Sequence, residues 1–331
     1  MSPMSHTANP HLIFATNFSE ACHAAIPMVA QWVDSLQAKL TLLHVHGRGA
    51  QAQASRALDS FFAESAHYPH SDRQLLSGAT AAGIAEFCSQ HPQSMLVMPP
   101  SVRTYLPRPF HSSLRTEVLR QVTTPMLTML PDTYAVPELP KTGGRVACWI
   151  TGDETRLDHV REAASLARQR DAELHLLFVL PEVSEGLMLE ALYSERPLAE
   201  PAAMQRLDDI AARVGDDVRV RIQIGTGDTQ RTLAKLLRQC RAQTLVVDRD
   251  TAVRKRLLRT SFASALRESP CLLICVPPRF KQQNDLLPPP NARQALEEKA
   301  QRPSLVVARR AIAQSRRSWL AADWSSDFVP A

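Results

Sequence analysis

One apolar stretch occurs twice in the chain and decides the fold that the sequence predicts. Ala38-Lys-Leu-Thr-Leu-Leu-His-Val45 matches Ala172-Glu-Leu-His-Leu-Leu-Phe-Val179. The same offset aligns Leu12–Glu20 with Val146–Glu154. Collinear matches of this kind indicate that the chain contains two copies of one structural unit.

Two later segments extend the repeat at a larger offset. Gly78-Ala-Thr80 falls on Gly227-Asp-Thr229, and Gln93–Val97 falls on Gln243–Val247. The offset grows because the second copy has a longer insert after its second strand, at about residues 181–201.

Each copy alternates short apolar runs with segments of helical periodicity. In the first copy the apolar runs are residues 12–16, 40–45, 94–98 and 126–130. Short runs that are apolar almost throughout are typical of parallel strands with helices on both faces. Alternating strands and helices predict right-handed crossovers and a doubly wound sheet. The sequence therefore predicts two Rossmann-like α/β domains.

Helical spacing is clearest after the first strand of each copy. We expect a helix over Ser19–Gln37, with Ser19 as its N-cap and a kink or a loose first turn at Pro27. In the second copy we expect Asp153 to cap the corresponding helix. The apolar stripes of these helices are Cys22, Ala25, Ile26, Val29, Val33 and Leu36, and then Leu157, Val160, Ala164 and Ala167.

Proline and glycine mark the expected domain boundaries. Domain 1 is expected over residues 10–130, a linker with three prolines over 131–144, and domain 2 over 145–278. Residues 279–331 form a basic, proline-containing C-terminal tail.

Composition sets the class of protein. At 331 residues, with 44% hydrophobic and 21% charged residues, the chain suits two globular domains. It has no apolar run long enough to cross a membrane and no signal peptide, so we expect a cytoplasmic protein. The six cysteines form no CxxC pair, and we expect buried thiols rather than a redox or metal site.

The net charge of +5 is concentrated in the tail, where residues 281–331 hold eight basic and five acidic residues. The nearly neutral remainder gives poor support for a nucleic-acid-binding domain.

Several segments together resemble one family. Ile13–Glu20, Leu40–Val45, Met95–Val97 and Ser113–Arg120, followed by Thr124-Pro125, look in this order and spacing like a universal stress protein domain. The second copy resembles the same family through Ala172–Val179, Gly227, Leu245–Val247 and Ser269-Pro-Cys271. The chain is therefore similar to a tandem universal stress protein.

The resemblance implies a five-stranded parallel sheet of strand order 3-2-1-4-5 in each domain, with helices on both faces. It also implies pairing of domains through the last strand, so the two copies are expected to form an internal pseudo-dimer, with further dimerisation open.

Members of this family that bind ATP have an aspartate at the end of the first strand and a Gly-x2-Gly-x9-Gly-Ser/Thr stretch after the fourth. The glycines let backbone N–H groups approach the phosphates. In the first copy Asn17 stands at the aspartate position, and Pro99, Val102 and Ser112 stand at the glycine positions. Only Ser113 is retained.

The second copy departs from the same pattern. Thr151 takes the aspartate position, and Asp248 and Thr251 stand where glycines are expected. The last helix is expected to begin near Thr260-Ser261. ATP or AMP is thus a conceivable rather than an expected ligand. The candidate nucleotide contacts are Asn17, Val45, Val102, Arg103, Ser112, Ser113, Thr151, Thr260 and Ser261.

Arginines near the two loops leave an alternative open, because guanidinium groups can hold phosphates without glycines. These basic residues either replace the lost loop or are solvated surface charges: Arg103, Arg108 and Arg115 in the first copy, and Arg249, Arg254, Lys255, Arg256 and Arg259 in the second.

Two other kinds of site are not expected. His44 and His46 share a strand face, with His67 and His70 further on, but no cysteine or carboxylate cluster accompanies them. No nucleophile elbow, Walker loop or paired-carboxylate pattern is present, so we expect no enzyme.

The tail carries a separate possibility. Residues 299–317 contain six basic residues and no acid. Leu305, Ala308, Ile312 and Trp319 line one face if this segment is helical. It is read either as a solvated extension or as a segment that docks on a membrane surface, a partner or nucleic acid.

The leading functional hypothesis is a non-enzymatic cytoplasmic stress-response protein that acts through protein contacts or self-association at sheet edges, with nucleotide binding weakened or lost. One alternative is an ATP or AMP sensor that uses domain 1. The other is an adaptor whose basic C-terminal helix docks on membrane or nucleic acid.

Overall fold

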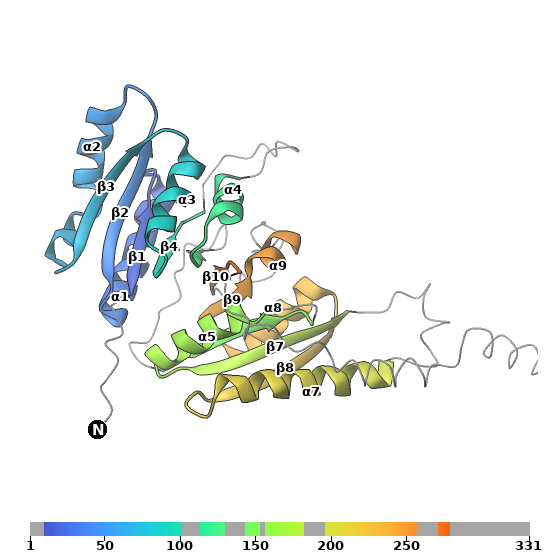
Figure 1. The fold of residues 1–331 in the computed structure, drawn as a ribbon. Coiled ribbons are helices and arrows are strands. Elements are labelled where there is room, and N and C mark those ends of the chain that lie inside the picture. Colours follow the sequence, from blue (N-terminus) through green and yellow to red (C-terminus); the bar gives the residue numbers. More distant parts are fainter. Residues whose placement is uncertain are drawn as a thin grey trace, which may run out of the picture. The chain divides into compact units, whose positions relative to one another are not determined.

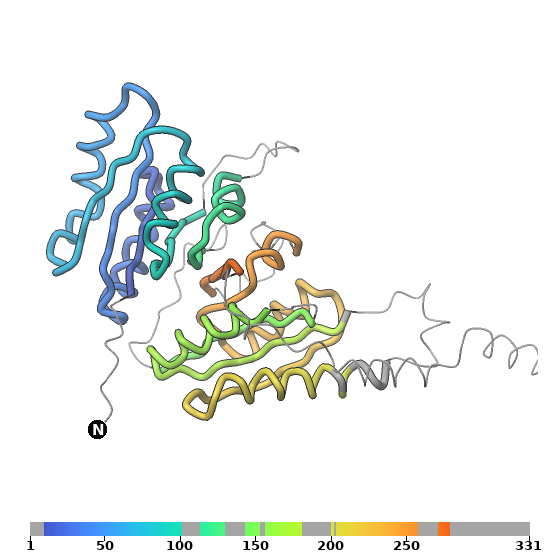
Figure 2. Tube along the Cα trace, viewed as in Figure 1, coloured from blue at the N-terminus to red at the C-terminus, as the bar shows by residue number. Residues whose placement is uncertain are grey.

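The computed structural model describes residues 10–100, 113–129, 143–152, 156–181, 196–255, 257 and 271–278. All of them belong to one compact unit, Met1–Asp285, and their path can be followed in Figure 2. Among these residues, no helix combines the length and the apolar character that crossing a bilayer requires.

The N-terminal half is a parallel α/β sheet. Its strands are β1 (His11–Ala15), β2 (Lys39–His46), β3 (Ser71–Ser77), β4 (Ser94–Val97) and β5 (Met126–Thr128). They lie in the order β3-β2-β1-β4-β5. The helices are α1 (Glu20–Leu36), α2 (Gln51–Ser60), α3 (Thr80–Gln90) and α4 (Leu114–Gln121), with a short 3-10 helix, η1, at Ala63–His67.

The C-terminal half repeats this arrangement, as Figure 1 shows. Its strands are β6 (Arg145–Ile150), β7 (Glu173–Pro181), β8 (Val220–Gly227), β9 (Thr244–Asp248) and β10 (Leu272–Val276). Their order is β8-β7-β6-β9-β10. The helices are α5 (Asp158–Gln169), α7 (Arg196–Val214), α8 (Thr229–Cys240) and α9 (Arg249–Arg254). The predicted order 3-2-1-4-5 is therefore confirmed in both halves.

The two halves join through their last strands. β5 and β10 pair antiparallel, with Thr128 opposite Leu273, Leu127 opposite Ile274 and Met126 opposite Cys275. The result is one sheet of ten strands. The pairing expected between domains thus occurs inside the chain, while the expected domain boundaries stay a prediction.

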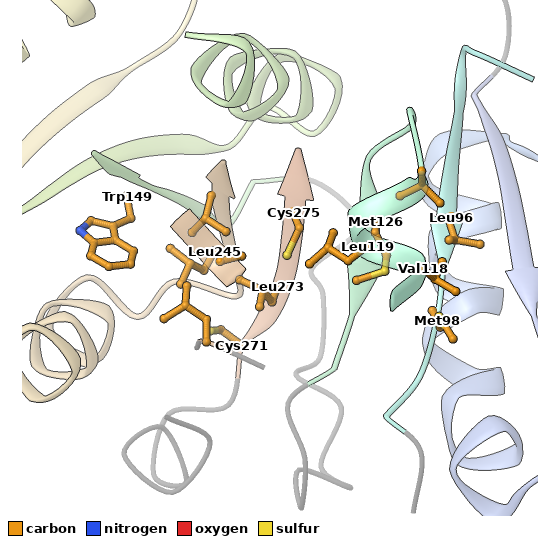
Figure 3. Packing of buried hydrophobic residues seen from close by; sticks show 14 of the residues in the cluster. Leu96, Met98, Val118, Leu119, Met126, Trp149, Leu245, Cys271, Leu273 and Cys275 are labelled. Atoms are coloured by element: carbon orange, nitrogen blue, oxygen red, sulfur yellow. The ribbon is translucent and has the colours of Figure 1, made fainter. Parts of the chain in front are cut away.

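A shared hydrophobic core covers this junction. Leu119 and Met126 from the N-terminal half belong to the same buried cluster as Leu273 and Cys275 from the C-terminal half, and Figure 3 shows these side chains close together. On α1, Trp32 is fully buried, and the Arg170 guanidinium carbon lies 5.7 Å from its ring centroid. An aromatic face attracts a guanidinium at this distance, which adds a second contact between the halves.

Helix α1 confirms most of its predicted stripe and corrects the rest. Cys22, Ala25, Val29 and Val33 are buried, whereas Ile26 and Leu36 are only half-buried. Met28 and Trp32 complete the buried face, because they lie three and seven residues after Ala25 and so on the same side of the helix. The helix runs from Glu20 to Leu36 with the exposed Pro27 inside it.

One of the two expected N-cap positions is confirmed, and the other is wrong. Ser19 occupies the N-cap position of α1, but its side chain makes no capping hydrogen bond. Helix α5 begins at Asp158 with Leu157 at the cap position, and Asp153 lies outside the described residues. The predicted stripe Leu157, Val160, Ala164 and Ala167 is buried as expected.

All six cysteines are buried and free of disulfides, as the sequence predicted. Burial raises the pKa of the Cys88 thiol to about 11 and that of Cys275 to about 12. These thiols therefore pack as small apolar side chains.

His11, the first residue of β1, makes the free energy of unfolding depend on pH. His11 Nε2 lies 2.8 Å from Thr41 Oγ1, and the His11 ring packs edge-on against His91. Burial, Lys39 and His91 lower the pKa of His11 to about 4, although Asp72 raises it. Above pH 6.5 the ring is neutral in both the folded and the unfolded chain, so this residue then costs nothing.

We predict that the free energy of unfolding falls as the pH is lowered from about 6.5 to 4, because only the unfolded chain protonates His11 in this window. His11→Gln should flatten this dependence, as measured by urea denaturation at several pH values. The control is His70→Gln at an exposed site, which should leave the slope unchanged. An equal slope in wild type and His11→Gln would contradict the assignment.

Candidate functional site

A cavity of about 190 Å³ lies at the carboxyl ends of β1, β2 and β4 in the N-terminal half. This is where the strand order reverses between β1 and β4, the usual place for ligands in open α/β sheets. Its wall is mostly apolar and contains Ala15, Thr16, Asn17, Ser19, Cys22, Leu43, His44, Val45, Thr80, Ile84, Met98, Pro99, Pro100, Leu114 and Arg115.

Asn17, which takes the family's aspartate position, lines the cavity but is engaged locally. Its Oδ1 accepts from the Ser19 amide at 3.2 Å and from the Cys22 thiol at 3.2 Å. The side chain therefore shapes the turn that leads into α1.

Val45 and His44 end β2 at the same cavity. His44 Nδ1 lies 2.8 Å from the Thr16 carbonyl oxygen, and since a carbonyl only accepts, Nδ1 is the donor. The ring of Phe18 stacks on His44, with 4.4 Å between centroids. Phe18 has φ of 60°, which is uncommon for a bulky residue, so this contact is made at some cost in backbone strain.

Ser113 begins α4 and caps it, because its hydroxyl accepts from the Thr116 amide at 3.2 Å. The next two residues, Leu114 and Arg115, line the cavity. The cavity thus lies beside the start of a helix, as the sequence predicted for this serine.

Arg115 is not a solvated surface charge, which was one of the two alternatives. Its side chain is buried, and Nη1 donates to Thr128 Oγ1 at 3.0 Å and to the Met129 carbonyl at 2.8 Å. Burial lowers the pKa of its guanidinium to about 10, so it stays charged at neutral pH. The sequence placed Arg115 near the site but gave no sign of these two partners on β5.

The segment after β4 starts with Pro99 and Pro100, which both line the cavity. Proline has no backbone N–H, so two donors that a phosphate-binding loop would use are missing here. Val102, Arg103 and Ser112, which the sequence also selected, lie outside the described residues.

In the C-terminal half, the segment after β9 corresponds to the segment after β4, and its first amides bind the carboxylate of Asp248. Asp248 ends β9 and caps α9, accepting from the Asp250 amide at 2.9 Å and from the Thr251 amide at 2.8 Å. Thr251 is buried. The amides that would face an anion at this helix start are therefore already satisfied by a negative charge.

The C-terminal half contains three further residues that the sequence selected as nucleotide contacts, and the structure describes one of them. Thr151 follows β6 and is half-buried, and Gly152 after it has φ of 89°. Thr260 and Ser261 lie outside the described residues. The structure therefore brings Asn17, Val45 and the start of α4 together at one cavity.

His44 and His46, which the sequence analysis considered as metal ligands, each bond a different backbone carbonyl. His44 donates to Thr16, while His46 Nδ1 donates to the Gly47 carbonyl at 2.7 Å. Within the described part of the chain, no group of three or more His, Cys, Asp or Glu is placed to hold a metal ion.

Sequence reasoning missed several cavity residues. Cys22, Thr80 and Met98 come from α1, α3 and the end of β4, and only the fold brings them to one wall. Their positions could have been inferred from the doubly wound topology, which gathers strand carboxyl ends and helix starts at one edge.

The C-terminal half of the chain matches a known protein family. Residues 144–277 match the sequence profile described as "Universal stress protein family". No curated protein sequence matches the chain.

Two solved structures share the fold. A universal stress protein from Archaeoglobus fulgidus DSM 4304 superposes with a TM-score of 0.58 at 14% identity, over 83% of this chain and 98% of that chain. A protein of unknown function from Pseudomonas aeruginosa PAO1 gives a TM-score of 0.51 at 15% identity, over 82% of this chain and 93% of that chain. At this identity the likeness concerns the fold alone. Residues 144–277 thus form a universal stress protein domain, and the N-terminal half has a similar fold.

Proposed function

We propose that this protein is a non-enzymatic, cytoplasmic stress-response protein of the universal stress type, which acts through contacts with other proteins and in which binding of adenine nucleotides is weakened or lost. The observation that carries the proposal is the Asp248 carboxylate on the Asp250 and Thr251 amides. A triphosphate at this helix start would have to displace a carboxylate and bear its charge nearby.

The first half supports the same proposal by a different route. Pro99 and Pro100 supply no N–H groups, and Asn17 replaces the aspartate with a side chain that already accepts two hydrogen bonds. Each half has thus lost donors or contacts that ATP-binding members of the family are implied to use.

The cavity wall also favours a role without catalysis. The Ser19 hydroxyl donates to Cys22 Sγ at 3.5 Å, and the Cys22 thiol donates to Asn17 Oδ1. An activated nucleophile needs a base within hydrogen-bonding reach. Both protons are directed to neighbours other than His44, whose Nδ1 proton goes to Thr16.

The edges of the sheet support the proposal that this protein acts through contacts with other proteins. The last-strand edges, which the family resemblance implies for pairing, are occupied by each other as β5 and β10. The outer strands of the described sheet are β3 and β8, whose unpaired edges remain for partners or for a second copy.

One observation favours a second candidate, an adenine-nucleotide sensor in the N-terminal half. The cavity at the β1/β4 switch point is retained, and it is lined by Asn17, Val45 and the buried Arg115. The adaptor hypothesis depends on residues 279–331, which lie outside the described part of the chain, and it stays a prediction.

The deciding measurement is the nucleotide content of the purified protein. We expect denaturation to release no stoichiometric nucleotide by mass spectrometry, and titration with ATP or AMP to give no heat in a calorimeter. The reason is that Pro99 and Pro100 have no N–H to donate and that Asp248 already binds two amides at the start of α9. Stoichiometric release or micromolar binding would contradict the proposal. Loss of that binding in Ala15→Leu, which narrows the cavity, would then establish the sensor in the N-terminal half.

The occupied amides of α9 can be tested through stability. Asp248→Ala should lower the free energy of unfolding by about 1 kcal/mol, because two amide donors lose their acceptor. Asp248→Asn should restore most of this loss, since asparagine caps nearly as well. Urea denaturation measures both, with exposed Asp216→Ala as the control. No loss in Asp248→Ala would mean that the amides do not depend on this carboxylate.

A further inference from the structure

Arg115 lines the cavity of the N-terminal half and also contacts the end of β5. The residue lines the cavity near the start of α4. Its guanidinium extends to the end of β5, where it donates to Thr128 Oγ1 at 3.0 Å and to the Met129 carbonyl at 2.8 Å. A buried guanidinium depends on such acceptors, because losing them leaves a charge poorly solvated.

Thr128 connects a second segment of the wall to the same point. Its hydroxyl donates to the Met98 carbonyl at 2.7 Å, and Met98 lines the cavity at the end of β4. Both wall segments, the start of α4 and the end of β4, are therefore tied to one residue of β5.

That residue lies in the junction between the two halves. Thr128 is opposite Leu273 of β10, and the junction is only three residue pairs long. Arg115 is close enough to Cys275 on β10 to lower the pKa of its thiol against the larger effect of burial, and α4 also contacts α9. In Figure 3, Leu273 and Cys275 lie on the strand that faces Met126 and Leu119.

We propose that Arg115 couples the cavity to the junction: a group that fills the cavity displaces the guanidinium from Thr128 and Met129 and thereby loosens the pairing of β5 with β10. The coupling depends on position alone and holds for any occupant of the cavity, whether or not that occupant is a nucleotide. By thermodynamic linkage, a loosened junction must in turn make the cavity easier to fill.

The test uses a side chain as the occupant, so no ligand needs to be known. Ala15→Leu extends a side chain from β1 into the cavity and is not part of the junction. Hydrogen exchange is followed at the amides of Leu273–Cys275 in the full chain. We expect Ala15→Leu to accelerate this exchange by about five-fold or more, the lower end of typical coupling between sites.

The same change is then made in an Arg115→Met background. Arg115→Met should itself accelerate exchange at the junction, and Ala15→Leu should add nothing further, because the connecting side chain is gone. Arg120→Met, at an exposed position of the same helix, is the matched control and should preserve the effect of Ala15→Leu. Equal acceleration in the wild-type and Arg115→Met backgrounds would overturn the proposal, as would no acceleration in either.

A second variant guards against misfolding of Ala15→Leu. Thr128→Val keeps the shape of the side chain but removes the hydroxyl that bonds Arg115 and Met98. We expect faster exchange at Leu273–Cys275 together with faster alkylation of Cys22, which lines the cavity, measured by peptide mass spectrometry. A change at only one of the two places would show that they are independent.

Discussion

The antiparallel pairing of β5 with β10 is the contact on which the rest of the structure depends. An edge strand presents unpaired N–H and C=O groups, which usually attract another chain. Here each half satisfies the edge of the other, with Leu127 opposite Ile274 at the centre. A single buried cluster then extends across both halves, so α4 and β10 share one core. The two halves therefore form one compact unit, although each has the complete strand order of its own sheet.

Helix α4 connects the junction to the cavity at the carboxyl ends of the strands. Helix α4 must contribute to the core through Val118 and Leu119 and to the cavity through Leu114 and Arg115. Leu114 and Arg115 come four residues before Val118 and Leu119, so both pairs lie on one face of α4, about one turn apart along its axis. Arg115 connects the cavity to β5, because this residue lines the cavity and its guanidinium donates to Thr128.

The two halves depart from the phosphate-binding pattern that the family resemblance implies, and they do so by different chemistry. In the second half a carboxylate satisfies the helix-start amides, so the loop is complete without a ligand. In the first half Pro99 and Pro100 remove donors, but the hollow itself is kept. Removing a donor leaves space that another molecule can fill, whereas satisfying the donor does not. The first half therefore keeps a cavity at the carboxyl ends of its strands, while the start of α9 in the second half already binds a carboxylate.

The sequence by itself determined the repeat, the strands and the strand order through family resemblance, because the repeated apolar runs and helical stripes are local patterns that depend on few distant contacts. It also identified Asn17, Val45 and Ser113 as residues of the carboxyl edge. Only the tertiary structure decided that Asp248 caps α9 and that Arg115 is buried against Thr128, since a charged residue in a loop looks the same in sequence whether it is solvated or bound. The partner of each such side chain is set by long-range packing, above all by the β5–β10 contact, which no local pattern encodes.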